Sequence, residues 1–312
     1  MEFEDKINHF IFPFPPMDLS NLDIYKNYLI HIPTKRKIKD TEKIEKIPCL
    51  FRKNEKSQNI LIIFHCNGAD MFNIFGNIYD IIGKDINILV PEYPGYSIYD
   101  YSPLSSEKCL ENSLIIYDFI LNNIKNIKEE NIYILGRSLG TGPAIYLSSK
   151  RNPAGTFLIS PYTTFAAVAE KIHNEEELKA LSKHFRSIDY IDKINSPLLI
   201  IHGKIDKLIN CNEAVILYEK CRKDIIKEIN LVNEMTHNFD YFLLKDKIIP
   251  LIEKFVDKYC PIKNSLENDK NKIIIDFSKE LYTLPDELKQ YINSEDLELV
   301  LSDNDIKIED SD

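Results

Sequence analysis

Short apolar runs that alternate with helical patterns constrain the fold of this chain more than any other feature of its sequence. Each run is bounded by polar or glycine-containing turns, and most are rich in isoleucine and leucine. Such runs are typical of strands buried on both faces of a sheet. They span residues 60–64, 86–90, 131–135, 156–159 and 197–201, and a last strand, with polar residues among its apolar ones, is expected at 225–232. Helical segments are expected at 71–82, 105–124, 141–150, 214–221 and 241–259. This alternation predicts an α/β fold with a mostly parallel central sheet and helices on both faces.

The first 57 residues depart from this pattern. Residues 28–32 and 47–51 are expected to form short strands that lead the sheet in an antiparallel arrangement. Residues 10–16 read Phe-Ile-Phe-Pro-Phe-Pro-Pro, and such a segment suits neither a helix nor a central strand. We expect an extended arm packed on the domain, with a membrane-touching wedge as the alternative. The sequence therefore predicts an N-terminal section at 1–57 and an α/β core at 58–260.

An acidic extension follows the core. Residues 261–312 contain 14 acidic residues and six lysines, and the whole chain has a formal net charge of −10, so the remainder is nearly neutral. Within the extension we expect a strand or packing hook at 273–277, helical turns at 285–292 and disorder at 302–312. A solvated tail is the first interpretation and a partner-binding segment the alternative. No clustered basic excess points to nucleic acid.

The cysteine spacing and the hydropathy of the chain indicate its cellular compartment and argue against a metal site or a membrane span. Six cysteines are scattered, none forms a C-x-x-C pair, and no His/Cys cluster has metal-ligand spacing. The pattern predicts reduced thiols in a cytoplasmic protein, with no metal and no cofactor. No run approaches the roughly 20 apolar residues that cross a membrane. The oligomeric state is left open.

A cluster of glycines surrounds one serine. The chain has nine glycines in 312 residues, and three of them lie between 136 and 142. The sequence Gly-Arg-Ser-Leu-Gly at 136–140 follows an expected strand and precedes an expected helix. A sharp strand-to-helix turn that presents a serine needs small residues on both sides, as in the G-x-S-x-G nucleophile elbow. Ser138 taken alone would more often be a helix-capping serine, so its assignment depends on partners elsewhere.

Two later strand ends supply those partners. Asp206 follows the strand at 197–201, and His237 follows the last strand. A serine hydroxyl needs a base within hydrogen-bond reach, a histidine can take and return its proton, and a carboxylate can orient that histidine. Taken singly, Asp206 would be a turn aspartate and His237 a surface histidine. The order Ser, Asp, His at three strand ends predicts a catalytic triad. If Asp206 pointed away, the alternative acids would be Asp189 and Asp192.

An oxyanion site is expected between two loops. The backbone N–H of Leu139 would be one donor, and the loop after 60–64 would supply the other, most simply from Asn67. His65 is expected to shape that loop, and His202 to pack beneath Asp206.

These motifs resemble the α/β-hydrolase fold over residues 58–259, about two thirds of the chain. Within that fold the sequence is similar to serine hydrolases of the ABHD17 type and to the Bem46-like proteins. The matching pieces are an H-x-N-x-x-D loop at 65–70, Tyr-Pro-Gly-Tyr at 93–96, Gly-Arg-Ser-Leu-Gly-Thr-Gly-Pro at 136–143, Ser-Pro-Tyr-Thr at 160–163, Ser-Pro-Leu-Leu-Ile-Ile-His-Gly at 196–203, Asp206 and the pair at 237–238.

The resemblance implies hydrolysis of acyl esters or thioesters. The best-known members of this family remove palmitate from cysteines of membrane-associated proteins, so an acylated protein or a small acyl ester is the expected substrate. Ser138, Asp206 and His237 take the triad roles by position, and Tyr96 lies in a loop expected near the substrate. The short segment at 160–196 implies that there is no large cap domain. Lipid-ester hydrolysis, serine aminopeptidase activity and a catalytically silent binding module stay open.

Two departures from the family pattern matter. Cys66 stands where the family has glycine in its H-G-N loop, so its side chain either narrows the oxyanion loop or packs. The first cysteine is Cys49, so a cysteine-rich, lipidated N-terminus like that of the family is not expected. Peripheral membrane contact would need another means, for which the aromatic arm at 10–16 is the candidate.

Overall fold

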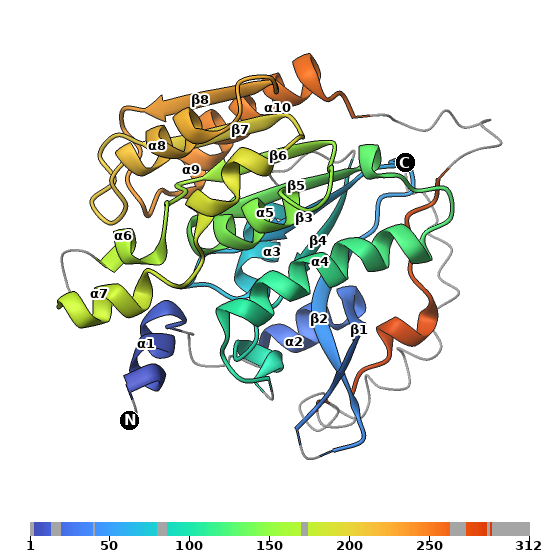
Figure 1. Ribbon diagram of the computed structural model, residues 1–312. Helices are drawn as coiled ribbons and strands as arrows, with labels where there is room; N and C mark the ends of the chain where they lie inside the picture. The colour runs from blue at the N-terminus through green and yellow to red at the C-terminus, as the bar shows by residue number, and fades with distance from the viewer. Residues whose placement is uncertain are drawn as a thin grey trace.

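One eight-stranded sheet organises the chain, in the order β1-β2-β4-β3-β5-β6-β7-β8 (Figure 1). The computed structural model describes residues 3–13, 20–39, 41–79, 86–100, 102–169, 174–262, 273–285 and 288. The strands are β1 (Leu29–Lys37), β2 (Ile44–Arg52), β3 (Ile60–Phe64), β4 (Asn87–Pro91), β5 (Ile132–Arg137), β6 (Gly155–Ile159), β7 (Leu198–Gly203) and β8 (Lys227–Val232). β1 and β2 run antiparallel to their neighbours, and the strands from β4 to β8 are parallel. The mostly parallel sheet predicted from the sequence is confirmed.

Helices cover both faces of the sheet. One face carries α4 (Ser106–Asn123), α5 (Thr141–Ser148) and α8 (Asn212–Lys220), and the other carries α3 (Met71–Tyr79) and α10 (Ile249–Tyr259). Successive strand residues point to opposite faces. In β3, Ile60 and Ile62 therefore join the cluster beneath α4, α5 and α8, whereas Leu61 and Ile63 join the cluster beneath α3 and α10. This two-sided burial explains why the strands appear in the sequence as continuous apolar runs.

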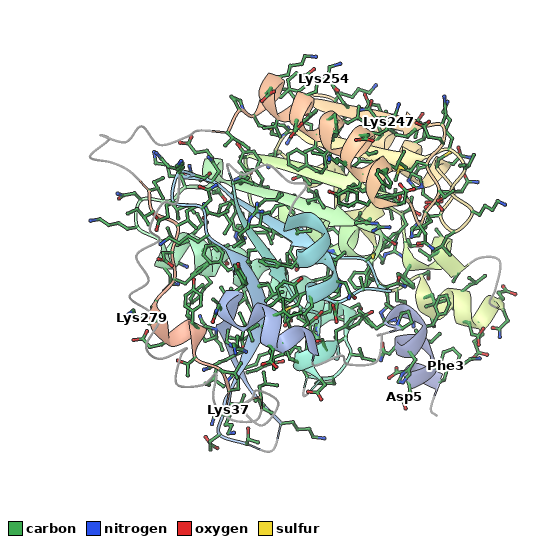
Figure 2. The ribbon with its side chains drawn as sticks, turned by 180° about the vertical axis from the view of Figure 1, so that it is seen from behind. Phe3, Asp5, Lys37, Lys247, Lys254 and Lys279 are labelled. Carbon is green, nitrogen blue, oxygen red and sulfur yellow. The ribbon has the colours of Figure 1, made fainter. Side chains whose placement is uncertain are left out.

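Figure 2 views the molecule from the side opposite to Figure 1, so the face that carries α3 and α10 is turned toward the reader. Lys247 and Lys254 extend from its helical segment into solvent. This segment was expected to be one helix at 241–259, but it comprises α9 (Tyr241–Leu243), a π-helical turn (Leu244–Ile248) and α10. The reason lies in Pro250, which has no N–H and whose ring clashes with the carbonyl four residues earlier. The wider turn accommodates the proline without ending the helical path.

The N-terminal arm differs from the prediction. Residues 3–11 form α1 (Phe3–Ile11), so the beginning of the aromatic segment is helical rather than extended. The helix ends before Pro13, since a residue that precedes proline disfavours the helical conformation. Ile11 and Phe12 are fully buried, and the ring of Phe12 lies edge-to-face against Tyr96. Ile11 and Phe12 thus pack into the core, and Phe10 is half-buried against it, so this part of the segment forms no wedge. Residues 14–16 lie outside the described residues.

Two short α-helices lie between β6 and β7, followed by 3-10 turns at Ser187–Asp189 and Ile191–Lys193. The helices are α6 (Phe165–Ala169) and α7 (Glu175–Leu181), and the described residues of this segment, 160–169 and 174–197, contain no large cap domain. Asn174 caps α7, since its side chain accepts a hydrogen bond from the Glu177 N–H at 3.0 Å. A further short helix, α2 (Ser20–Tyr25), precedes β1. Within the described ranges, no helix combines the length and hydropathy required to cross a membrane.

The extension after α10 contributes a short packed segment. Residues 273–277 form no strand, but Ile275 and Phe277 are buried, and Phe277 lies edge-to-face on Phe51 of β2 at 4.7 Å between ring centroids. Lys53 donates a hydrogen bond to Asp276 at 2.7 Å. Of the two expected structures, the hook is the one observed. Residues 289–312, including the expected acidic end, lie outside the described residues.

Candidate active site

Ser138 lies at the sharp turn between β5 and α5. Its φ of 51° is in the left-handed region, which residues with a side chain rarely adopt. The turn fits because its neighbours are glycines. A Cβ on Gly140 would lie 2.0 Å from the carbonyl oxygen of Phe64, and a Cβ on Gly136 would lie 2.4 Å from the carbonyl oxygen of Gly140. Close backbone approach between β5, α5 and the end of β3 therefore explains the glycine cluster.

The structure brings the three predicted catalytic side chains together. The Ser138 Oγ lies 3.0 Å from the His237 Nε2, and the His237 Nδ1 lies 2.8 Å from the Asp206 Oδ2. The loops that carry Asp206 and His237 meet where a Cβ on Gly203 would lie 2.0 Å from the Met235 carbonyl oxygen. A glycine at the end of β7 is therefore needed for this contact. The three side chains form one continuous hydrogen-bonded chain.

Both carboxylate oxygens of Asp206 accept hydrogen bonds. Its Oδ1 accepts hydrogen bonds from the backbone N–H groups of Leu208 and Ile209, both at 2.9 Å. Burial by itself would raise the pKa of this carboxyl, but the hydrogen bonds from His202 and His237 outweigh burial and hold the pKa well below its usual range. Asp206 therefore stays ionised at neutral pH. The alternative acid Asp189 is engaged elsewhere, because it pairs with Arg186.

Buried hydrogen bonds of His65 and Glu92 hold the loop after β3 in place. His65 is fully buried, with its Nε2 3.0 Å from the Glu92 Oε1 and its Nδ1 2.9 Å from the Cys66 carbonyl oxygen. Glu92, at the end of β4, also accepts hydrogen bonds from the N–H groups of Tyr93 at 2.9 Å and Met71 at 3.1 Å. Sequence reasoning assigned no role to Glu92. The sequence signal for this role was an acidic residue directly after a buried, mostly apolar strand.

Tyr96 supports this loop from within the core. Its side chain is fully buried, and its hydroxyl donates a hydrogen bond to the Asn67 carbonyl oxygen at 2.9 Å. Burial raises the pKa of Tyr96 far above its ordinary value, so the hydroxyl keeps its proton and remains a donor. The structure thus places Tyr96 beneath the loop rather than on its open side. Cys66 is half-buried in the same loop, and Leu139 is buried directly after Ser138.

Arg137 is a second residue that sequence reasoning missed. Its Nη2 donates a hydrogen bond to the His237 carbonyl oxygen at 3.2 Å, and its guanidinium lies 4.2 Å from the centroid of the Phe239 ring. The arginine therefore ties the residue before the elbow to the loop that carries the histidine. A basic residue within the G-x-S-x-G motif was the only sequence signal for this contact.

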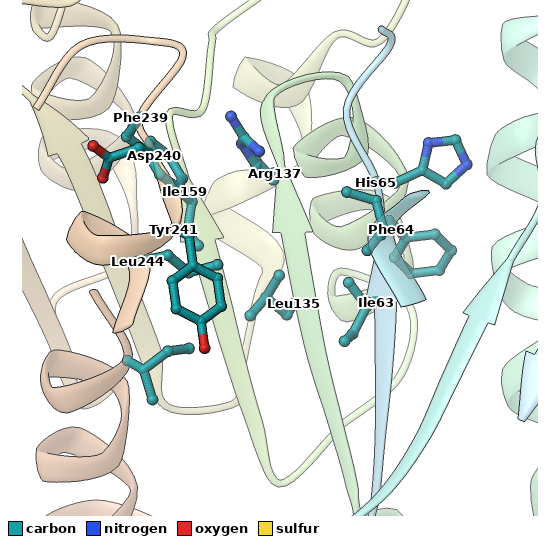
Figure 3. A pocket seen from close by; sticks show the side chains of 12 residues that line it. Ile63, Phe64, His65, Leu135, Arg137, Ile159, Phe239, Asp240, Tyr241 and Leu244 are labelled. Carbon is teal, nitrogen blue, oxygen red and sulfur yellow. The ribbon is translucent and has the colours of Figure 1, made fainter. Parts of the chain in front are cut away.

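An apolar cavity of about 150 Å³ lies behind the histidine loop (Figure 3). Ile63 and Leu135 point toward it from β3 and β5, and Arg137 and Asp240 lie at its upper end. Its walls are Ile63, Phe64, His65, Ile74, Leu135, Arg137, Ile159, Phe239, Asp240, Tyr241, Leu244 and Ile249, so Ser138 is not among them. Among the residues that the structure describes, no group of three or more His, Cys, Asp or Glu side chains could hold a metal ion.

Comparison with known proteins places this site in a family context. No family model matches the chain. The human α/β hydrolase domain-containing protein 17B is 31% identical over 188 residues, covering 59% of this chain and 63% of that protein. Protein 17C of Xenopus laevis is 31% identical over 188 residues, covering 59% of this chain and 58% of that protein. The chain therefore matches less than two thirds of the length of these curated relatives.

Solved structures share the fold at low sequence identity. An esterase of Pyrococcus furiosus aligns with a TM-score of 0.58 at 16% identity, covering 80% of this chain and 98% of that one. The 2,6-dihydroxy-pseudo-oxynicotine hydrolase aligns with a TM-score of 0.59 at 12% identity, covering 74% of this chain and 67% of that one. At sequence identities this low, the structural similarity is evidence for the fold alone. The chain therefore has the α/β-hydrolase fold, and its sequence is similar to curated proteins of the ABHD17 type.

Proposed function

We propose that this chain is a serine hydrolase that cleaves acyl esters or thioesters, with Ser138 as nucleophile, His237 as general base and Asp206 as the acid that orients it. The observation that carries the proposal is the hydrogen-bonded chain from Ser138 through His237 to Asp206, with distances of 3.0 and 2.8 Å. A binding or structural module has no need of this arrangement. The glycines that permit the turn and the loop contact support the same assignment.

The chemistry follows from the positions of the atoms. The His237 Nε2 takes the proton of Ser138 as its Oγ attacks the acyl carbonyl carbon. The resulting oxyanion would accept hydrogen bonds from the N–H groups of Leu139 and Asn67. The tetrahedral intermediate then expels the alcohol or thiol, which takes the proton from His237. Water repeats the sequence on the acyl-enzyme and releases the acid, while Asp206 stabilises the imidazolium in both steps.

An S-acylated protein is the substrate we favour. The resemblance to the ABHD17 type supports it, and so does the short segment between β6 and β7, which would leave room for an acyl chain displayed on another protein. A lipid ester would use the same chemistry.

Peripheral contact with a membrane belongs to the same proposal. Four apolar side chains in and beside the loops that carry Asp206 and His237 are exposed by 42–69%: Ile205, Leu208, Tyr241 and Phe242. Exposed apolar side chains near a site for acyl chains suit a lipid interface. All six cysteines are free thiols, which supports a cytoplasmic location.

A fluorophosphonate probe tests the proposed nucleophile. The probe is expected to label the wild-type chain and not Ser138→Ala, because the alanine variant has no hydroxyl to be phosphonylated. Labelling of Ser148→Ala serves as the control, since Ser148 is a buried serine of α5 whose hydroxyl bonds to Thr156. Equal labelling of wild type and Ser138→Ala, or no labelling of either folded protein, would refute the proposal.

The aminopeptidase alternative requires an anion that binds a substrate amine. Asp240, at the mouth of the cavity, is the candidate for that role. Asp240→Asn removes the charge but keeps the helix cap, in which the side chain accepts a hydrogen bond from the Leu243 N–H at 2.9 Å. We expect kcat/KM for acyl thioesters to change by less than about twofold, because a neutral acyl chain offers no cation to this carboxylate. A tenfold loss confined to aminoacyl substrates would instead favour the aminopeptidase.

A further inference from the structure

A second histidine contacts the carboxylate of Asp206. His202 lies at the end of β7 and is fully buried. Its Nε2 lies 3.4 Å from the Asp206 Oδ2, the same oxygen that lies 2.8 Å from the His237 Nδ1. The His202 Nε2 also lies 3.0 Å from the carbonyl oxygen of Ile209. Two histidines therefore converge on one carboxylate oxygen.

The surroundings of His202 determine its tautomer. Both partners of Nε2 are oxygen acceptors, so Nε2 must carry the hydrogen. The other ring nitrogen, Nδ1, is buried and has no hydrogen-bond partner among the described residues. A buried N–H without an acceptor is costly, so Nδ1 carries a lone pair. His202 is therefore a neutral ring whose single N–H is divided between Ile209 and Asp206.

This ring closes a small hydrogen-bonded circuit. Asp206 Oδ1 accepts from the Ile209 N–H at 2.9 Å, and the Ile209 carbonyl accepts from His202 at 3.0 Å. Leu208 adds a second N–H to the Asp206 Oδ1 at 2.9 Å. These hydrogen bonds fix the orientation of the Asp206 carboxylate, so that its Oδ2 faces His237. Buried donors that orient a functional side chain in this way are typical of pre-organised sites.

We propose that His202 is a positioning residue for the triad, orienting Asp206 and withdrawing charge from the carboxylate oxygen that faces His237. This inference rests on the proposed function. In the described part of the chain, the titratable groups whose hydrogen bonds act on Asp206 are His202 and His237. A donor to Oδ2 weakens the attraction of that oxygen for the imidazolium of His237. Removing the donor leaves a more basic carboxylate, so His237 keeps its proton to higher pH and is a less available base at neutrality.

The chain offers a matched pair of substitutions. In His202→Gln the side-chain amide nitrogen can occupy the position of Nε2 and keep the donor, whereas in His202→Asn the amide is too short to reach Asp206. We would follow the ring resonances of His237 by NMR across pH in the full chain. His202→Asn is expected to raise the titration midpoint by about 0.5 to 1 pH unit, and His202→Gln by less than about 0.3 unit. The acidic limb of kcat/KM should shift in the same direction.

The NMR titrations distinguish a positioning role of His202 from a purely structural one. Equal midpoints in wild type and His202→Asn, or the same shift in His202→Gln as in His202→Asn, would overturn the proposal. The wild-type chain supplies an independent test if a variant fails to fold: its imidazole ¹⁵N spectrum should show His202 as the Nε2–H tautomer, and an Nδ1–H tautomer would equally overturn it. Neither NMR measurement needs turnover, so a failure of the hydrolase proposal in the fluorophosphonate experiment remains distinguishable.

Discussion

Replacing His237 by alanine is expected to lower kcat for acyl-thioester hydrolysis by about 10⁶-fold, the scale seen when the base of a serine triad is removed. The physical reason is that the Ser138 Oγ, 3.0 Å from the His237 Nε2, would have no group to take its proton during attack. KM should change little, because the imidazole contributes to proton transfer rather than to holding the acyl chain. The measurement is steady-state hydrolysis of a palmitoyl thioester and of a short-chain ester.

A second histidine provides the control for this result. His9 of α1 is exposed, and its Nδ1 lies 3.1 Å from the carbonyl oxygen of Asp5 in the same helix, so His9→Ala should retain wild-type kcat. Added imidazole should restore part of the activity of His237→Ala, since the vacated position lies beside Ser138. If His237→Ala kept more than about one hundredth of the wild-type kcat while remaining folded, the assignment of the base would be wrong.

Asp206→Asn is expected to lower kcat by about 10⁴-fold while leaving the fold intact. Asparagine can still accept hydrogen bonds from the N–H groups of Leu208 and Ile209, so the loop after β7 should persist. The amide cannot stabilise an imidazolium, and its NH₂ group favours the histidine tautomer that has no lone pair on Nε2. The base facing Ser138 is thereby disabled. Circular dichroism and thermal unfolding should show a native chain with little activity.

The alternative acid gives the matched comparison. Asp189→Asn removes a carboxylate that pairs with Arg186, and it should change kcat by less than about twofold, because exposed pairs of this kind contribute little. A large loss in Asp189→Asn together with an active Asp206→Asn would reverse the assignment.

Acid titration adds an independent readout on Asp206. Its pKa is lower in the folded chain than in the unfolded chain, so the ionised carboxylate contributes stability above its ordinary pKa of about 3.9, and this contribution is lost as pH falls toward the folded value. The free energy of unfolding of Asp206→Asn should therefore fall less steeply than that of wild type in this acidic range. Urea unfolding at several pH values measures the difference. An equal or steeper fall in the variant would contradict this account.

Much of the fold could be predicted because strands that are buried on both faces of the sheet consist almost wholly of apolar residues. β3 coincides with the expected strand at 60–64, and the other parallel strands differ from expectation by one or two residues at their ends. The helix expected at 105–124 is α4 (Ser106–Asn123), and the Ser105 side chain caps it by accepting a hydrogen bond from the Lys108 N–H at 3.2 Å. Such features depend on neighbours in the sequence, so local chemistry suffices to find them.

The prediction failed where distant packing overrides local preference. The aromatic segment was read as extended because of its prolines, yet Phe10 and Ile11 complete a helix whose buried side faces the core. Tyr96 was expected near the substrate, but its ring packs against Phe12 and its hydroxyl reaches Asn67 inside the protein. In each case the deciding partner comes from a remote part of the chain.

The sequence by itself determined the order of strands and helices along the chain, the elbow around Ser138 and the identity of the candidate acid and base, because glycine spacing and apolar runs act locally. Only the tertiary structure decided that β4 lies between β2 and β3, that Glu92 anchors His65, that Arg137 holds the histidine loop and that His202 donates to Asp206. Apart from the contact of His202 with Asp206, which lies four residues along the chain, these contacts join residues that share no local pattern. They form only when parallel strands bring their carboxyl ends to one edge of the sheet.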